Sequence, residues 1–473
     1  MATVPASGGL MSLRQYLSRR LNSLDDANQR ILRDMTVIMA FVLVGKGVAA
    51  AKEAVIAWRY GVSEAIDAYL FVFNLIGLPI SIWYSILSAV YIPLSERIRA
   101  SDKNSLPIFR SELLGISIIL GVIIGIISCI LLMGLFHSSL SGLPDHTVVL
   151  ALDATPWLAM VIPLAVVTHY GSVMTMAEGR HRNTLFEGIP ALGLMGAVLI
   201  ASSGGIYPLI WGSLAGAALH MIILLVALAR ERGRSFDLPR FSLRSPAWPL
   251  LWAGIGVMLL AQTLQSITAV VDQFFAAHLA SGSIATLTYS NRVLSLLLTL
   301  SATAIARALL PVFSGLATNH ADALRHRARR WAWSMLAVGF VIVAATWPCA
   351  RFIISILFER GAFSSADGDN VTAVFRLGLL QIPFYLAGIV TAQALFTAGR
   401  YKIITIACAL NLLIKLCMSF ALVPIFGLQG LMYGTAIMYA AYAATLMAAL
   451  SRPSPGRAAI SPPDTGVAED SEK

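Results

Sequence analysis

Lysine and arginine side chains lie inside several long apolar stretches of this sequence, where a charged group is costly. Lys46 is near the middle of the apolar stretch 41–58, and Lys52 and Glu53 follow within the same stretch. An ionisable side chain at bilayer depth costs about 2.5–3.5 kcal/mol on insertion scales, so it normally faces a water-filled cavity or a partner of opposite charge. Several cations around one cavity would bind an anion such as a phosphate.

Later apolar stretches carry further polar side chains. Gln262, Gln265 and Asp272 share a heptad-spaced stripe. Arg292 and Arg307 are fifteen residues apart, which places them within about 60° of one another around a helix. Each pattern therefore predicts a polar face that points away from lipid.

A plainer interpretation is that these charges only hold helices together. Lys52 could pair with Glu53 or extend its ammonium toward the membrane surface. Arg376 and Lys415 are two more cations in apolar stretches, whereas the acids at this depth are chiefly Glu53 and Asp272. Helix pairing would balance the charges, so the excess of cations favours a cavity that binds an anion.

The composition requires membrane-spanning elements to position these side chains. The sequence is 58% hydrophobic and 12% charged with a mean hydropathy of +0.77, against roughly 45–50% and 25% in soluble domains. Continuous apolar runs of about 20 residues predict membrane-spanning helices and exclude the alternating pattern of a β-barrel. The predicted fold class is an all-α polytopic membrane protein with twelve helices, at 35–58, 67–95, 113–136, 149–176, 187–204, 206–229, 248–277, 285–315, 331–358, 371–398, 402–425 and 427–450.

The net charge of +10 is concentrated in alternate loops. Segments such as "ARERGRSFDLPRFSLR" and "RHRARR" follow even-numbered stretches, whereas intervening loops such as "HLASGS" hold almost no Lys or Arg. The positive-inside rule then places the even loops and both termini in the cytoplasm. This alternation argues against a nucleic-acid surface. The four cysteines have neither metal-site spacing nor a disulfide pattern, and we expect no cofactor.

Three short strings recur at nearly constant offsets. "GIYPLIWG" aligns with "GLQGLMYG", "AEGRHR" with "TAGRYK" and "YIPLSERI" with "LLPVFSGL". The repeat predicts two six-helix lobes in the same orientation, at 34–230 and 248–450, around a central cavity, as in transporters. Residues 231–247 would form a cytoplasmic linker. We expect 1–33 to be a cytoplasmic segment, either an interfacial helix or a solvated lead-in, and 451–473 to be a disordered tail.

Several motifs resemble those of one family. "KEAVIAWRYGVSEAIDAYLFVF", "FFAAHLASGSIATLTYSNRVL" and "SILFERGAFSSADGDN" are similar to segments of the lipid II flippase (MurJ/MviN) family, which belongs to the multidrug/oligosaccharidyl-lipid/polysaccharide (MOP) exporter superfamily. The resemblance implies the twelve-helix, two-lobe MOP fold and a flippase in the bacterial inner membrane. It also implies that Lys46, Lys52 and Arg292 hold positions where the family has cavity arginines that engage a lipid-linked pyrophosphate.

This sequence departs from the family pattern at two places. The second stretch, "NLIGLPISIWYSILSAVYIP", lacks the arginines of the family, and Asn291 replaces an acidic residue. These departures favour another polyprenyl-linked sugar, such as an exopolysaccharide precursor, over lipid II. The membrane potential could drive transport, or Asp272 or Glu53 could bind Na⁺ or H⁺ as the coupling ion.

The residues and the resemblance together predict a flippase for a polyprenyl-pyrophosphate-linked sugar, not an enzyme. Its partners would be the anionic lipid-linked glycan and membrane lipids. The alternatives are a MATE-like multidrug or cation antiporter, which would want an acidic cavity, and a non-transporting scaffold. We assign substrate binding to Lys46, Lys52, Arg292 and Arg307, a coupling or cavity role to Glu53 and Asp272, and further cavity positions to Asp67, Gln262, Gln265, Arg376 and Lys415.

Overall fold

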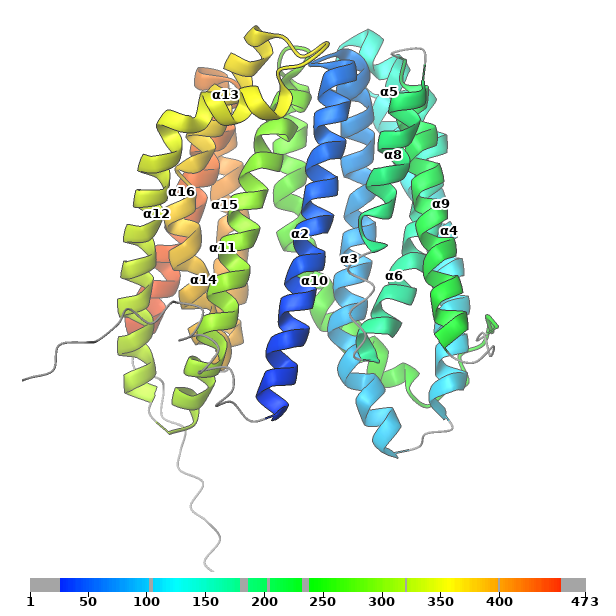
Figure 1. Cartoon of the computed structure of the whole chain (residues 1–473), viewed down its shortest axis with the longest axis vertical. Coiled ribbons are helices and arrows are strands. Elements are labelled where there is room, and N and C mark those ends of the chain that lie inside the picture. Colours follow the sequence, from blue (N-terminus) through cyan, green and yellow to red (C-terminus); the bar gives the residue numbers. More distant parts are fainter. Residues whose placement is uncertain are drawn as a thin grey trace, which may run out of the picture. The chain divides into compact units, whose positions relative to one another are not determined.

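The computed structural model describes residues 26–101, 105–178, 186–201, 205–231, 238–319, 321–398 and 400–451 (Figure 1). Within these ranges the regular secondary structure is helical and no strand occurs, which confirms the all-α prediction. Of the expected N-terminal segment 1–33, only 26–33 are described, as the start of a helix. Of the expected tail 451–473, only Ser451 lies within the described residues.

Ten of the twelve predicted stretches coincide with single helices, and two coincide with broken pairs of helices. The first half contains α2 (Asp26–Tyr60), α3 (Glu64–Ser101), α4 (Ser105–His137), the 3₁₀ turn η1 (Ser139–Ser141), α5 (Asp145–Ala159), α6 (Val161–Ala177), α8 (Ile189–Ile200) and α9 (Tyr207–Glu231). The second half contains α10 (Trp248–Ala277), α11 (Ser283–Asn319), α12 (Ala321–Phe358), α13 (Ser365–Leu379), α14 (Ile382–Thr397), α15 (Tyr401–Phe426) and α16 (Leu428–Ser451).

Two predicted helices are interrupted at the same point of each repeat. The α5–α6 pair breaks at Met160, and the α13–α14 pair breaks at Leu380 and Gln381. At each break the backbone tightens, since Met160 N donates to Trp157 O and Gln381 N donates to Gly378 O. Pro163 and Pro383 lie in the first turn of α6 and α14, where a missing N–H is tolerated. Each pair is still continuous enough to count among the eight helical spans of bilayer length found in the described residues.

The chain divides into two compact units. The first unit comprises Met1–Ser266, Ala276–Tyr289 and Ile354–Asp369, and the second comprises Ile267–Phe275, Ser290–Ile353 and Asn370–Lys473. Short segments from the second half of the sequence therefore belong to the first unit. The lobe boundaries expected from the repeat stay a prediction.

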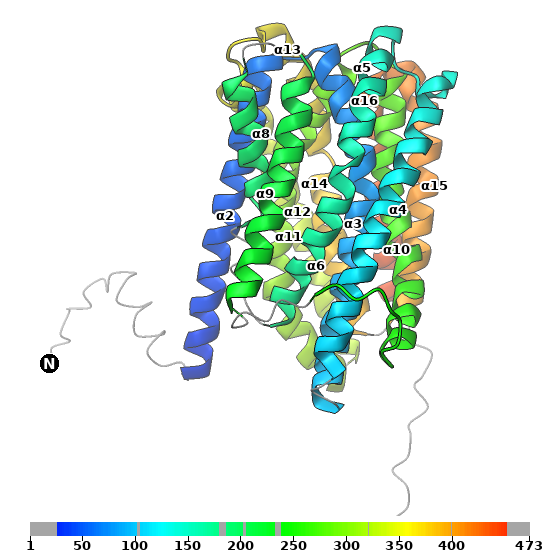
Figure 2. The ribbon, with the colours of Figure 1, turned by 90° about the vertical axis from the view of Figure 1, so that its right-hand side faces the viewer.

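Small residues allow close packing in the first unit. Helix α8 packs against α9 and α2 (Figure 2). A side chain at Gly193 would overlap the backbone of Gly216, so these two glycines set the distance between α8 and α9. The Tyr69 and Ser213 hydroxyls share a hydrogen bond of 2.8 Å between α3 and α9. Helix α2, which carries Lys46 and Lys52, joins this group through its contact with α8.

The second unit is built around α12, α14, α15 and α16 (Figure 1). Its core consists largely of alanine and leucine, as shown by the buried residues Ala332, Ala387 and Leu446. A side chain on Gly339 would overlap Pro383, so α12 and the start of α14 lie in close contact. Small side chains at these contacts suit helix association in lipid, where packing replaces the hydrophobic effect.

A buried carboxylate on α4 holds the segment that leads into α10. Glu112 is 1% exposed and accepts hydrogen bonds from Ser242 Oγ, Arg244 N, Ser245 N and the Trp248 indole, at 2.6, 3.1, 3.1 and 2.7 Å. The backbone of the same segment bonds directly to α4, since Arg240 N donates to Ser111 O at 2.9 Å. One acidic side chain therefore fixes the path of the linker between the two sequence repeats.

Replacement of Glu112 by alanine should destabilise the first unit by about 3 kcal/mol, because several buried donors would lose an ionised acceptor. The matched control is Glu96→Ala, since Glu96 is exposed and pairs with Arg99 on its own helix. Thermal unfolding in detergent and limited proteolysis between residues 238 and 247 would measure the effect. Equal melting temperatures for the two variants would refute a clamping role for Glu112.

Candidate functional site

The lysine pair on α2 lies within the first unit. Lys52 Nζ is 2.8 Å from Glu53 Oε1, and the two side chains are 16% and 7% exposed. The burial of Glu53 requires a nearby cation, because an unpaired carboxylate in a low-dielectric environment is strongly disfavoured. Lys52 is therefore charge-compensated, and its predicted role toward a substrate anion stays a prediction.

Lys46 has an acidic neighbour that the sequence analysis missed. The Lys46 charge acts on the carboxylate of Glu187, which lies just before α8. Helices α2 and α8 run side by side, and at their far ends Arg59 donates to Ala201 O at 2.9 Å. The sequence signals that the two residues lie at similar depth, since Glu187 precedes the end of α8 by nearly the same number of residues as Lys46 precedes the end of α2. It does not signal that α8 packs on α2.

The arginine candidates belong to the second unit. Arg292 on α11 is exposed, and Arg376 on α13 donates from Nε to Trp347 O at 3.3 Å on α12. The side chains of Arg307 and Gln265 lie outside the described residues, and Gln262 on α10 is partly buried. The four candidate substrate cations thus divide between the two units, and their convergence on one cavity stays a prediction.

An ion pair built on a fully buried lysine joins three helices of the second unit. Lys415 on α15 is 0% exposed, and its Nζ lies 2.5 Å from Asp272 Oδ1 on α10. The same ammonium donates to Leu431 O at 3.2 Å and to Thr435 Oγ1 at 2.5 Å on α16. The ammonium therefore has two hydrogen-bond acceptors and one carboxylate of opposite charge around it. This contact explains why the α10 segment Ile267–Phe275 belongs to the second unit.

Asp67, in the first turn of α3, caps the start of α11. The side chain is 3% exposed, and its two oxygens accept from Gly282 N at 2.6 Å and Ala285 N at 2.7 Å. Gly282 directly precedes α11 and Ala285 lies in its first turn, so the carboxylate faces the positive dipole end of that helix. Gly282 has a φ of 87°, and a side chain there would overlap Val62. The glycine therefore permits the close approach that the cap needs.

The α2–α3 turn makes further contacts with the same unit. Tyr289 donates to Gly61 O at 3.1 Å, and Ala362 N donates to Trp58 O at 2.8 Å. Gly61 has a φ of 54°, and a side chain there would overlap the Ala362 carbonyl. We call this set, residues 58–67 with 282–289 and 358–363, the α2–α3 junction. It brings together the three motifs that carry the family resemblance.

Solved transporter structures share this arrangement of helices. A structure described as "Lipid II flippase MurJ, inward closed conformation" matches with a TM-score of 0.72 and 17% identity, over 88% of each chain. An inward-facing multidrug resistance MATE family transporter of the MOP superfamily matches with a TM-score of 0.65 and 17% identity, over 85% of this chain and 93% of that one. The chain is thus a polytopic membrane protein with the MOP exporter fold.

The sequence assigns the family within this class. The family described as "Lipid II flippase MurJ" matches residues 56–459. The chain belongs to this family, whose members are membrane transporters and not enzymes. Membership and the apolar helices make it a multi-pass protein of the bacterial inner membrane, and the predicted resemblance is confirmed.

Individual relatives match over parts of their length. The probable lipid II flippase MurJ of Bdellovibrio bacteriovorus is 27% identical over 257 residues, 52% of this chain and 47% of that protein. The Helicobacter pylori relative is 33% identical over 177 residues, 37% of this chain and 38% of its own length. The Buchnera aphidicola relative is 22% identical over 423 residues, 85% of this chain and 79% of its own. The matches thus span half or less of the first two relatives.

Removal of the Lys415 charge should destabilise the second unit, because Asp272 would remain buried without its cation. We expect Lys415→Met to cost about 3 kcal/mol, and Lys415→Met combined with Asp272→Leu to cost less than either single change. Lys402→Met on the exposed part of the same helix is the matched control. Thermal unfolding of the purified variants measures the coupling. Additive losses in the double variant would show that the two side chains do not interact.

Proposed function

We propose that this chain is a flippase that moves a polyprenyl-pyrophosphate-linked sugar precursor from the inner to the outer leaflet, with lipid II as the first candidate. The observation that carries the proposal is the match of the lipid II flippase MurJ family over residues 56–459. The MOP exporter fold supports the same function, because that fold serves transport by alternating access.

The cationic side chains give the proposal its chemistry. A pyrophosphate headgroup is strongly hydrated and cannot enter hydrocarbon unaided. Lys46, Lys52, Arg292 and Arg307 would replace its water by charge-assisted hydrogen bonds. Glu53 pairs with Lys52, and the charge of Lys46 acts on Glu187, so each lysine has an acidic neighbour before substrate binds. Lysine has a long flexible stem, so each ammonium can leave its carboxylate for the phosphate without movement of α2.

The α2–α3 junction would act as the outer gate. The positive-inside rule places the C-terminal end of α2 on the outer face, with both termini in the cytoplasm. Asp67 and Tyr289 hold the junction through hydrogen bonds to backbone groups, and such bonds can be exchanged for water. Opening requires the exchange of a few polar contacts and exposes Tyr289 between Phe358 and Phe363.

The membrane potential would drive the outward step. An inside-negative potential favours outward movement of an anion by about 2.3 kcal/mol per charge per 100 mV. A coupling ion at Asp272 is less favoured, because Lys415 already neutralises that carboxylate. Glu53 is paired with Lys52 in the same way.

An exopolysaccharide precursor is the second candidate substrate. The absence of arginine from residues 74–93 of α3 favours it, because fewer fixed cations would suit a different headgroup. An MATE-like antiporter is disfavoured, since cation substrates require acidic cavities and the candidate residues are mostly basic.

Complementation tests the transport function directly. Expression of this chain in a bacterium depleted of its own lipid II flippase should restore growth and prevent lipid II from accumulating in the cytoplasmic leaflet. Failure to rescue, together with rescue of an exopolysaccharide flippase mutant, would select the second substrate. Failure in both hosts despite normal membrane levels would contradict the proposed function.

The cation roles can be tested in the same assay. Lys46→Gln and Arg292→Gln should reduce flipping at least tenfold, since each removes a charge-assisted contact to the phosphate. Lys46→Arg and Arg292→Lys keep the charge and should retain most activity. Immunoblots of membranes verify equal insertion. Wild-type transport by both glutamine variants would end the cationic-cavity proposal.

The gate role of Asp67 has a separate measurement. In a cysteine-free background, a cysteine at the buried position Thr288 should react slowly with an impermeant maleimide added outside the cell. Asp67→Ala should raise that rate severalfold, because two backbone amides lose their acceptor. Asp145→Ala is the control, since Asp145 is an exposed carboxylate at the same predicted membrane face. Unchanged labelling in Asp67→Ala would remove Asp67 from the gate.

A further inference from the structure

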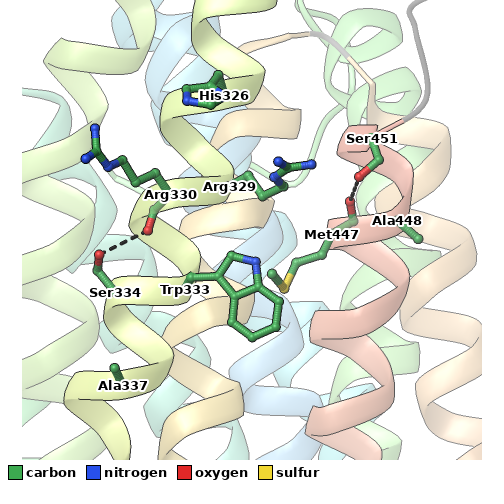
Figure 3. Close-up of a pocket in the computed structure, with 9 residues that line it drawn as sticks. All are labelled: His326, Arg329, Arg330, Trp333, Ser334, Ala337, Met447, Ala448 and Ser451. Carbon is green, nitrogen blue, oxygen red and sulfur yellow. Dashed lines mark hydrogen bonds between the residues drawn. The ribbon is translucent and has the colours of Figure 1, made fainter.

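A hollow lies between α12 and α16 in the second unit (Figure 3). Its described lining residues include none of the substrate-binding candidates. Its volume is about 980 Å³, and a smaller hollow of about 220 Å³ adjoins it. The lining includes His326, Arg329 and Trp333 from α12 and Met447 and Ser451 from α16. No acidic side chain is among the described residues that line either hollow.

The lining changes from charged to apolar along the helix axis. Arg325, His326, Arg329 and Arg330 lie in the first turns of α12, and Ala337 lies deeper in the apolar span. Trp333 separates the two parts. His326, Trp333 and Ala337 fall on one face, because their spacings of seven and four residues return to the same side of a helix.

We call the two hollows together the α12–α16 groove. Part of its basic lining and the tryptophan point into it. Figure 3 shows Arg329 and Trp333 extending from α12 toward Met447 and Ser451 of α16, whereas Arg330 turns to the other side. Trp333 is 58% exposed, and Trp331 on the same helix is 45% exposed. Tryptophan is enriched where the headgroup region meets the hydrocarbon. The groove is therefore set at the membrane surface, at the end that the positive-inside rule assigns to the cytoplasm.

We propose that this groove binds the headgroup of an anionic phospholipid from the cytoplasmic leaflet. Arg325 and Arg329 would contact the phosphate, and Trp333 would lie at the level of the glycerol backbone. An acyl chain would then follow the apolar walls formed by Ala337 and Met447. Basic pockets between membrane helices bind anionic headgroups in this way.

If the arginines of α12 served only to orient the helix in the membrane, the groove beside them would have no explanation. Positive-inside topology requires cations near a span but neither a preformed hollow nor a tryptophan beneath the cations. Small side chains at Ala337 of α12 and Ala448 of α16 leave the groove open between these two helices. Its shape and charge are those expected of a ligand site for a molecule with one anionic end and one apolar end.

Lipid retention on the purified protein tests the proposal. Native mass spectrometry should count at least one more retained phosphatidylglycerol than phosphatidylcholine per protein, and inorganic phosphate should not displace it. Arg325→Gln with Arg329→Gln should weaken phosphatidylglycerol binding about tenfold or more. The control pair is Arg97→Gln with Arg99→Gln, which removes the same charge from α3 at the same predicted membrane face.

Fluorescence quenching gives an independent measurement that does not depend on removal of charge. Phosphatidylglycerol with brominated acyl chains should quench the wild-type protein more than the Trp333→Phe variant, and brominated phosphatidylcholine should not show this difference. Equal retention by the two arginine pairs, or equal quenching with and without Trp333, would overturn the lipid site. Displacement by inorganic phosphate would assign the groove to a free anion and would also overturn it.

Discussion

A charge placed in hydrocarbon must be met by an opposite charge, by hydrogen bonds or by water, and three lysines of the described structure show how this constraint is met. Lys415 is met by Asp272, Leu431 O and Thr435. Lys52 is met by Glu53, and Lys46 lies near Glu187. The helices are consequently held in place by polar contacts as well as by close packing, and the pairs limit which charges remain for a substrate.

The fold could be predicted from the sequence, because every backbone N–H and C=O group in lipid needs a hydrogen-bond partner within the protein. Helix is the only element that long continuous apolar runs can form in lipid, so the twelve predicted stretches agree with helices in the structure. The breaks at Met160 and at Gln381 were not predicted, although Pro163 and Pro383 signalled them. A proline in a helix is compatible with a kink, a break or a helix start, and sequence alone does not choose among these.

The candidate site could be predicted less well from the sequence, because ion pairs depend on contacts between distant segments. In the sequence Lys46 has no acidic residue that balances its charge, whereas the packing of α2 on α8 brings Glu187 near it. The role of Asp67 also depends on distant residues, since its carboxylate oxygens accept hydrogen bonds from backbone amides more than two hundred positions away in the sequence. The motifs that resemble the family could be read locally, but their meeting at the α2–α3 junction could not.

The interruption shared by α5–α6 and α13–α14 bears on the history of the chain. Pro163 and Pro383 are separated by nearly the same interval as the recurring strings, as expected if the two halves of the sequence arose by duplication. A single six-helix ancestor would already have carried this bent element. Such an ancestor would have surrounded a cavity only by associating with a second copy of itself, and fusion of the two copies would then have allowed each half to acquire its own charges.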